Sequence, residues 1–188
     1  MLVKEREITI DTFEHYLNLP ENQDRLFELI NGEIVEKMPT EEHGYIAGNV
    51  ITAINNFAKP RKLGRAGVEV RHRLPLDPLN SRMPDVSFHG IRRPLVREGG
   101  VPEIAEFVVE IKSPNDSLKG MREKANYYIS HGARLVWLIL PHKRVVEVHE
   151  PEEDVQLYLD GDVLDGSNVL PGFTLPVSEL FDDPFLES

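Results

Sequence analysis

The chain has 188 residues, of which 40% are hydrophobic and 28% charged, and it contains no cysteine. This length predicts one domain, spanning residues 1–188, with a core of its own. The lack of cysteine excludes a disulfide framework and cysteine-ligated zinc. No apolar run approaches the roughly 18 residues that a membrane span needs, and the charged start, Met1–Glu7, is unlike a signal peptide. We therefore expect a cytoplasmic protein that makes no membrane contacts.

The formal net charge is −11, from 32 acidic residues against 21 lysines and arginines. Read alone, this charge opposes tight nucleic-acid binding, because contacts to phosphates need cations. The charge is uneven, however, since residues 59–97 hold ten basic and three acidic residues and no lysine or arginine follows Glu147. This pattern indicates either a basic binding face beside an acidic end, or basic side chains that only fill exposed loops.

The first part of the chain predicts a helix, a hairpin and a second helix. Asp11 is expected to cap a short amphipathic helix. Asn31-Gly32 separates two apolar strands, and both residues tolerate the positive φ angles of a type I′ turn. Residues 41–58 carry apolar side chains at three- and four-residue spacing, which predicts a helix that Pro60 ends.

The remaining elements predict a sheet. Strands are expected at residues 67–70, 72–76, 84–88, 107–112, 135–140, 144–149 and 155–159. A helix is expected over 116–131, ended by Gly132, and a helical turn at 177–181. Residues 135–140 are apolar without alternation, which is typical of a central strand buried on both faces. We therefore expect one α/β domain, with a mixed central sheet flanked by helices, an N-terminal hairpin and a C-terminal strand meander.

The strand over 107–112 carries the residues that suggest chemistry. Because strand side chains alternate, Glu110 and Lys112 point to the same face. If this strand pairs with the one that Asp85 begins, both carboxylates converge with Lys112 beside them. Mg²⁺ takes oxygen ligands, commonly one or two carboxylates, and activates phosphodiesters toward hydrolysis. The same spacing also fits ordinary solvent-facing residues, and the pattern leaves both interpretations open.

Two residues at the head of the helix over 41–58 are weaker candidates for the same site. Glu42 either adds an acidic group to the site or only complements the helix dipole. His43 either hydrogen-bonds a phosphate or a metal-bound water, or is a surface or capping histidine. Glu28, on the first hairpin strand, is either exposed or directed to the site.

Three residues near the Glu110 strand are also candidates. Ser113 directly follows this strand, in a segment that also has ordinary turn and cap chemistry. Lys124 lies one helical turn before Tyr128, so the two side chains share a helix face that is directed to the site or to DNA. Tyr128 also fits the buried stripe of its helix, and core packing is the expected role of its ring.

Several short motifs follow one another along the chain. They are RLFELINGE at 25–33, EH at 42–43, PDVSF at 84–88, VEIKSP at 109–114, KxxxY at 124–128, VWLI at 136–139, VLPGF at 169–173 and LF at 180–181. In this order the set resembles the Uma-two family of restriction endonucleases, and the resemblance covers nearly the whole chain.

The resemblance implies the PD-(D/E)XK nuclease fold, which is restriction endonuclease-like. It implies that Asp85 and Glu110 are metal ligands, that the backbone carbonyl of Ile111 completes the metal shell and that Lys112 is the catalytic lysine. The implied cofactor is Mg²⁺, with Mn²⁺ as an alternative, and the implied substrate is DNA. A homodimer is expected from the same resemblance, because cutting both strands needs two sites.

The sequence is compatible with three functions. The leading hypothesis is a divalent-metal-dependent DNA endonuclease, and it further expects the basic segment 59–97 to border the Asp85–Glu110 site. The alternative is a non-catalytic module on the same fold that binds nucleic acid or a protein, which the negative net charge keeps open. A third hypothesis is a metal-dependent hydrolase of small phosphoesters.

Overall fold

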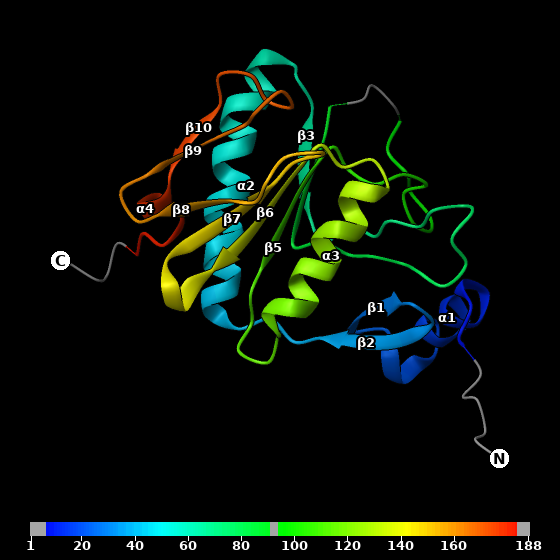
Figure 1. The fold of residues 1–188 in the computed structure, drawn as a ribbon. Helices are drawn as coiled ribbons and strands as arrows, with labels where there is room; N and C mark the ends of the chain where they lie inside the picture. The colour runs from blue at the N-terminus through cyan, green and yellow to red at the C-terminus, as the bar shows by residue number, and fades with distance from the viewer. Residues whose placement is uncertain (1–6, 91–93, 184–188) are drawn as a thin grey trace. The chain divides into compact units, whose positions relative to one another are not determined.

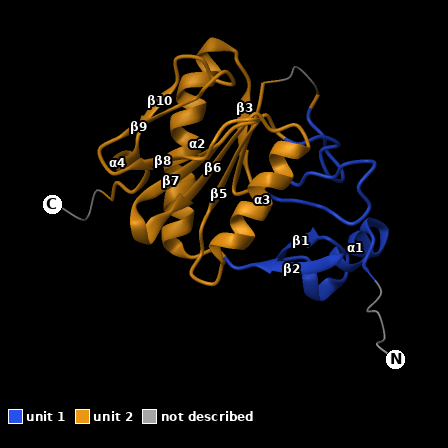
Figure 2. Cartoon of the chain, in the orientation of Figure 1, with its two compact units in different colours: residues 1–38, 71–83, 95–104 blue, residues 39–70, 84–94, 105–188 orange. Residues whose placement is uncertain are grey.

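The structure is a computed structural model that describes residues 7–90 and 94–183 (Figure 1). The chain forms two compact units, each assembled from several segments (Figure 2). Unit 1 comprises residues 1–38, 71–83 and 95–104, and unit 2 comprises residues 39–70, 84–94 and 105–188. That residues 1–188 act as one domain stays a prediction. Among the described residues, no helix has the length and apolar content that a membrane span requires.

Unit 1 contains a helix packed on a hairpin. Its elements are α1 (Ile10–Leu17), the 3-10 turn η1 (Pro20–Asn22), β1 (Leu26–Ile30) and β2 (Glu33–Lys37). Asn31 and Gly32 have φ angles of 51° and 80°, which confirms the predicted turn between β1 and β2. The prediction that Asp11 caps the helix is wrong, because the helix begins two residues earlier than such a cap requires. Thr9 is the N-cap and Asp11 lies in the first turn.

The predicted strand over 72–76 is wrong. Only His72 takes part in strand pairing, through isolated bridges to Arg82 and Val101. His72 and Arg73 form backbone hydrogen bonds with Arg82 and Val101. Pro75 has no N–H to donate to a sheet, and Leu76 is 97% exposed, so the pairing does not continue along the segment.

Unit 2 is built on a six-stranded sheet in the order β3-β4-β5-β6-β7-β8. The strands are β3 (Arg65–Val68), β4 (Val86–His89), β5 (Phe107–Ile111), β6 (Leu135–Leu140), β7 (Val145–His149) and β8 (Gln156–Leu159). β5 and β6 are parallel and all other neighbours are antiparallel, which confirms the predicted mixed sheet. Every residue of β6 is buried, as expected for a central strand. β3 ends before the predicted residue 70, because Glu69 adopts a positive φ of 50°.

Two helices cover the two faces of this sheet (Figure 1). α2 (Glu41–Arg61) packs Ile46, Val50 and Ile54 against one face, in a cluster that includes Val109 and Trp137. α3 (Leu118–Ser130) connects the parallel strands β5 and β6 and contacts the opposite face, which carries Glu110.

The ends of these two helices differ slightly from the predictions. The prediction that Pro60 ends α2 is wrong, because Pro60 lies inside the last turn. The helix ends at Arg61, and its C-cap Lys62 adopts a left-handed conformation. α3 begins at Leu118 rather than at residue 116, since Ser117 is its N-cap. Gly132 follows α3 with a φ of 110°, as predicted for a glycine that ends a helix.

The C-terminal part adds a small hairpin that was not predicted. The 3-10 turn η2 (Pro141–Lys143) precedes β7, and β9 (Val163–Asp165) pairs with β10 (Thr174–Pro176) before the helical turn α4 (Val177–Leu180). Each strand of this hairpin has three residues, too few to show an alternating pattern. Its buried Leu164 and Leu175 belong to the same core cluster as α2.

Glu147 is a second buried acidic residue on the α3 side of the sheet. Arg122 of α3 forms two hydrogen bonds to Glu147 of β7, at 2.9 and 2.6 Å, and the Nε2 atom of His149 lies 3.5 Å from the same carboxylate. The hydrogen bonds from Arg122 hold the pKa of Glu147 below its ordinary value. Burial lowers the pKa of His149, although the nearby Glu147 opposes this effect.

These shifts predict that acid destabilises the protein. Below about pH 6.5 the unfolded chain binds a proton that folded His149 does not, so the free energy of unfolding falls by up to about 1.4 kcal/mol per pH unit. The lowered pKa of Glu147 acts in the same direction at lower pH, because its stabilisation is lost only as the pH falls through the folded-state value. His149→Gln should make the fall less steep in denaturant titrations between about pH 7.5 and 5.5. His142→Gln, at an exposed histidine, is the matched control and should keep the wild-type slope.

Candidate active site

The strand that Asp85 precedes does pair with the strand of Glu110. β4 and β5 are antiparallel, with Val86 opposite Val109 as the last pair. Asp85 directly precedes Val86 and Glu110 directly follows Val109, so the two residues lie at the same end of this strand pair. Both side chains are almost fully buried, with 2% and 3% of their residues' surfaces exposed. The two acidic residues that the sequence singled out are therefore buried at the same end of the β4–β5 pair.

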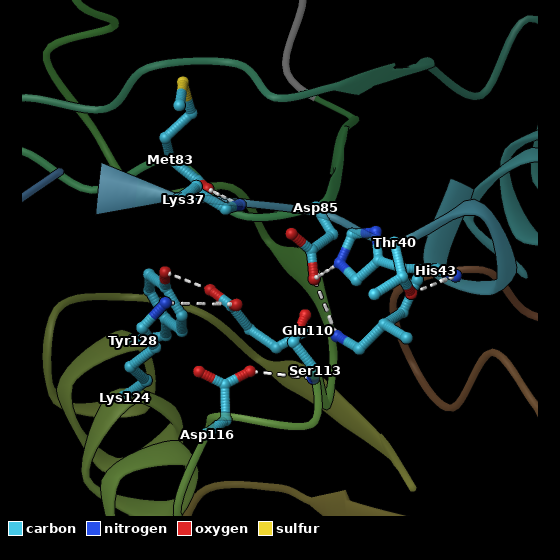
Figure 3. Close-up of polar contacts among 11 residues, drawn as sticks. Lys37, Thr40, His43, Met83, Asp85, Glu110, Ser113, Asp116, Lys124 and Tyr128 are labelled. Atoms are coloured by element: carbon cyan, nitrogen blue, oxygen red, sulfur yellow. Dashed lines mark hydrogen bonds and ion pairs between the residues drawn. The ribbon is translucent and has the colours of Figure 1, made fainter. Parts of the chain in front are cut away.

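Asp85 is held by groups from β5 and α2 (Figure 3). Its Oδ2 atom accepts a hydrogen bond of 2.7 Å from the backbone N–H of Ile111. The Nε2 atom of His43 lies 3.0 Å from the same oxygen. His43 is buried, so it is not the surface histidine that one interpretation of the sequence described, whereas its neighbour Glu42 is exposed at the helix start. The position of Glu42 agrees with the helix-dipole interpretation.

The start of α2 is itself fixed by a cap. The Thr40 hydroxyl accepts a hydrogen bond of 3.3 Å from the backbone N–H of His43, and Thr40 is the N-cap residue of the helix. A capped first turn places the imidazole of His43 at a defined distance from Asp85. Thr40 was not recognised from the sequence, although a threonine directly before two glutamates is a typical helix start.

Glu110 is contacted by two side chains from α3. The Tyr128 hydroxyl donates a hydrogen bond of 2.6 Å to Oε1, and the Nζ atom of Lys124 lies 3.3 Å from Oε2 (Figure 3). Lys124 and Tyr128 are four residues apart and so share one helix face. The Tyr128 ring is fully buried, as expected, but its hydroxyl contact was not predicted. The KxxxY spacing was the only signal in the sequence that could have indicated it.

Lys112 and Ser113 take part in the turn that follows β5. The Lys112 ammonium donates a hydrogen bond of 3.0 Å to the carbonyl of Ser113. The Ser113 N–H donates to the carboxylate of Asp116 at 2.8 Å, which supports the interpretation of this segment as a turn. The ammonium group that contacts Glu110 thus belongs to Lys124, whereas strand alternation alone pointed to Lys112.

Glu28 lies in unit 1 and is 1% exposed, so it is not a solvent-facing residue. Its carboxylate accepts a hydrogen bond of 2.9 Å from the backbone N–H of Met83, and Lys37 donates to the Met83 carbonyl at 2.7 Å. Burial lowers the pKa of the Arg71 guanidinium, while attraction to Glu28 and Glu14 opposes the shift. Glu28 therefore anchors the backbone segment that precedes Pro84-Asp85 in the chain.

The sequence predicts that the basic segment 59–97 borders the Asp85–Glu110 site. This prediction is wrong for the first residues of the segment. Lys59 lies in the last turn of α2 and His43 in its first, which separates them by roughly 24 Å at about 1.5 Å per residue. Arg71 and Arg73 are engaged within unit 1, with the Phe27 carbonyl and with Glu14. Arg92 and Arg93 lie outside the described residues.

The acidic side chains are too few for a metal site made of side chains alone. Within residues 7–90 and 94–183, no group of three or more His, Cys, Asp or Glu side chains is arranged to hold a metal ion. Two carboxylates and a backbone carbonyl form a smaller set, of the kind that Mg²⁺ completes with water.

The cap at Thr40 generates a stability prediction. Thr40→Ala removes the acceptor for the His43 N–H and should lower the free energy of unfolding by about 1 kcal/mol, the usual cost of losing an N-cap. Chemical denaturation measures this change. Thr52→Ala, at an exposed position inside the same helix, is the matched control and should be neutral or slightly stabilising. Equal effects of the two substitutions would contradict the capping role.

Comparisons with known proteins identify the family and the fold of the chain. The family model Uma2, described as "Putative restriction endonuclease", matches residues 13–178. The crystal structure of a putative nuclease of the DUF820 family from Anabaena variabilis is similar over 93% of this chain and 97% of that chain, with 26% sequence identity and a TM-score of 0.78. This similarity confirms the predicted fold class. None of the curated proteins compared matches the chain. Because the family model covers most of its length, the chain belongs to the Uma2 family.

Proposed function

We propose that this protein is a divalent-metal-dependent endonuclease that hydrolyses DNA phosphodiester bonds. The observation that carries the proposal is that two buried carboxylates, those of Asp85 directly before β4 and Glu110 in β5, lie at the same end of this strand pair. Membership of a family described as restriction endonucleases, and similarity to a protein described as a nuclease, support the same reaction class.

The donor groups around Asp85 and Glu110 fit a hard divalent cation. Carboxylate oxygens are the ligands that Mg²⁺ and Mn²⁺ prefer, and Mg²⁺ commonly uses one or two of them. Ile111 donates its N–H to Asp85, and in a strand the carbonyl of the same residue points to the same side as its N–H. We therefore assign Asp85, Glu110 and the Ile111 carbonyl as the groups that hold the metal. A bound Mg²⁺ would polarise the scissile phosphate and acidify a water molecule.

The remaining side chains have supporting roles in this proposal. His43 fixes the orientation of the Asp85 carboxylate from the capped start of α2. Lys112 is half-buried and lies two residues after Glu110, and its ammonium donates a hydrogen bond to the backbone carbonyl of Ser113. We assign Lys112 to stabilise the negative charge that develops on the phosphate. A single mobile ammonium group suits this role, because it exchanges one oxygen acceptor for another.

A non-catalytic module on the same fold is the second candidate. The net charge of −11 and the distance of Lys59 from His43 favour it, since both weaken the attraction between the site and DNA. Binding of DNA that weakens with salt, without cleavage, would support this candidate. A homodimer belongs to the first proposal, because two sites are needed to cut both strands.

The proposed activity predicts cleavage of plasmid DNA in the presence of Mg²⁺ or Mn²⁺ and its loss with a chelator. Asp85→Asn and Glu110→Gln should each lower the cleavage rate by about 100-fold or more, the usual effect of removing a group that stabilises charge in a reaction. Lys112→Met should also lower the rate while leaving metal binding intact, since the ammonium group is not a metal ligand.

Glu42→Gln is the matched control for these substitutions, because it removes one exposed carboxylate next to His43. Its rate should equal that of the wild type. Cleavage that persists in Asp85→Asn and with a chelator would overturn the proposal. Hydrolysis of small phosphoesters without cleavage of DNA would instead support the third hypothesis.

A further inference from the structure

The surroundings of Glu110 indicate how the two oxygens of its carboxylate are used. We infer that Tyr128 is a positioning residue that holds Oε1, and that Lys124 is a resident counter-ion that occupies Oε2 until a divalent cation displaces it. This inference rests on the proposed function. It adds which oxygen of Glu110 would bind the metal ion, and it states that Lys124 and the metal ion compete for that oxygen.

The contact at Oε1 is the more rigid of the two. The Tyr128 hydroxyl lies 2.6 Å from Oε1, and the Tyr128 side chain is fully buried against the sheet. A short hydrogen bond from a buried phenol to a carboxylate is strong and fixes the direction of the carboxylate plane. Moving this hydroxyl would require α3 to shift, because Tyr128 lies in the helix and packs in the core.

The contact at Oε2 is longer and more easily broken. The Nζ atom of Lys124 lies 3.3 Å from Oε2, and 21% of the Lys124 side chain is exposed. A lysine side chain has a flexible stem and can move its ammonium group into water at low cost. Of the two contacts, the one from Lys124 is therefore the one that a cation would replace.

The two residues consequently have opposite effects on metal affinity. The ammonium of Lys124 neutralises Glu110 and competes for the oxygen that a metal ion needs, so it weakens metal binding. The hydroxyl of Tyr128 aligns the carboxylate and strengthens metal binding, as hydrogen-bond partners of metal ligands generally do. If both residues had purely structural roles, removing the Lys124 ammonium and removing the Tyr128 hydroxyl would not change metal affinity in opposite directions.

Calorimetric titration of the folded protein with Mn²⁺ and with Mg²⁺ tests this inference. Lys124→Met should bind metal more tightly than the wild type, whereas Lys124→Arg, which keeps the charge, should resemble the wild type. Tyr128→Phe should weaken metal binding by about 10-fold, the lower end of the usual effect of losing a partner of a metal ligand. Thermal unfolding without metal gives a second readout, because Lys124→Met should lower stability by leaving the buried Glu110 carboxylate without this cation.

Two substitutions on the same helix serve as controls. Lys119→Met removes a lysine that is 87% exposed, and Tyr127→Phe removes the hydroxyl of the adjacent tyrosine. Both should keep wild-type metal affinity. Metal binding by Lys124→Met that equals or falls below the wild-type value would overturn the role of Lys124, and unchanged binding by Tyr128→Phe would overturn that of Tyr128. Wild-type protein that binds neither metal would overturn the proposed function together with this inference.

Discussion

The antiparallel pairing of β4 with β5 is the interaction on which the candidate site depends. Asp85 directly precedes Val86, the last residue of β4 that pairs with β5. Its side-chain carboxylate accepts a hydrogen bond from the N–H of Ile111 and so continues the hydrogen bonding between the two strands. Any shift in register would move Asp85 away from Glu110, and a shift by one residue would turn a side chain to the other face. The apolar residues of β5 that pack against α2 oppose such a shift, because Val109 and Ile111 are buried there.

The sheet of unit 2 separates stability from chemistry by its two faces. The face toward α2 is apolar and contains Trp137, Phe107 and the leucines of the C-terminal hairpin. The face toward α3 carries the carboxylates of Glu110 and Glu147, each with a cation from that helix. Burying a carboxylate without a partner costs free energy of folding, so the ion pairs with α3 are needed to hold Glu110 and Glu147 inside the protein. A large apolar core on one face allows the other face to hold groups that add little to stability.

Sequence reasoning located the parts of the fold that are set locally. The hairpin at Asn31-Gly32 depends on two residues that accept positive φ, and the buried strand β6 shows its burial in its composition. The placement of Asp85 and Glu110 at the same end of one strand pair could be expected, because it needs only that two recognisable strands become neighbours. The contacts of His43 with Asp85 and of Tyr128 with Glu110 could not be predicted, since each joins a helix to a residue distant in the sequence. The spacing of residues does not determine which polar group of a buried side chain bonds to which acceptor. Alternation assigns Lys112 to the face of Glu110, but the direction of a flexible lysine is decided by nearby carbonyls such as that of Ser113.

The distribution of charge shows why proximity in sequence is a poor guide to a binding surface. The basic residues that begin the segment 59–97 lie at the far end of a helix of 21 residues, and others in the segment are used to hold unit 1 together. A site centred on Asp85 and Glu110 attracts cations, and DNA can approach it only if positive charge is supplied there. Lys124 supplies one positive charge 3.3 Å from Glu110, and a divalent ion would supply two at the carboxylates themselves. Under the proposed function, the local field at the site rather than the net charge of −11 would decide whether a phosphate binds, and the ion that would activate the phosphate would also make its approach favourable.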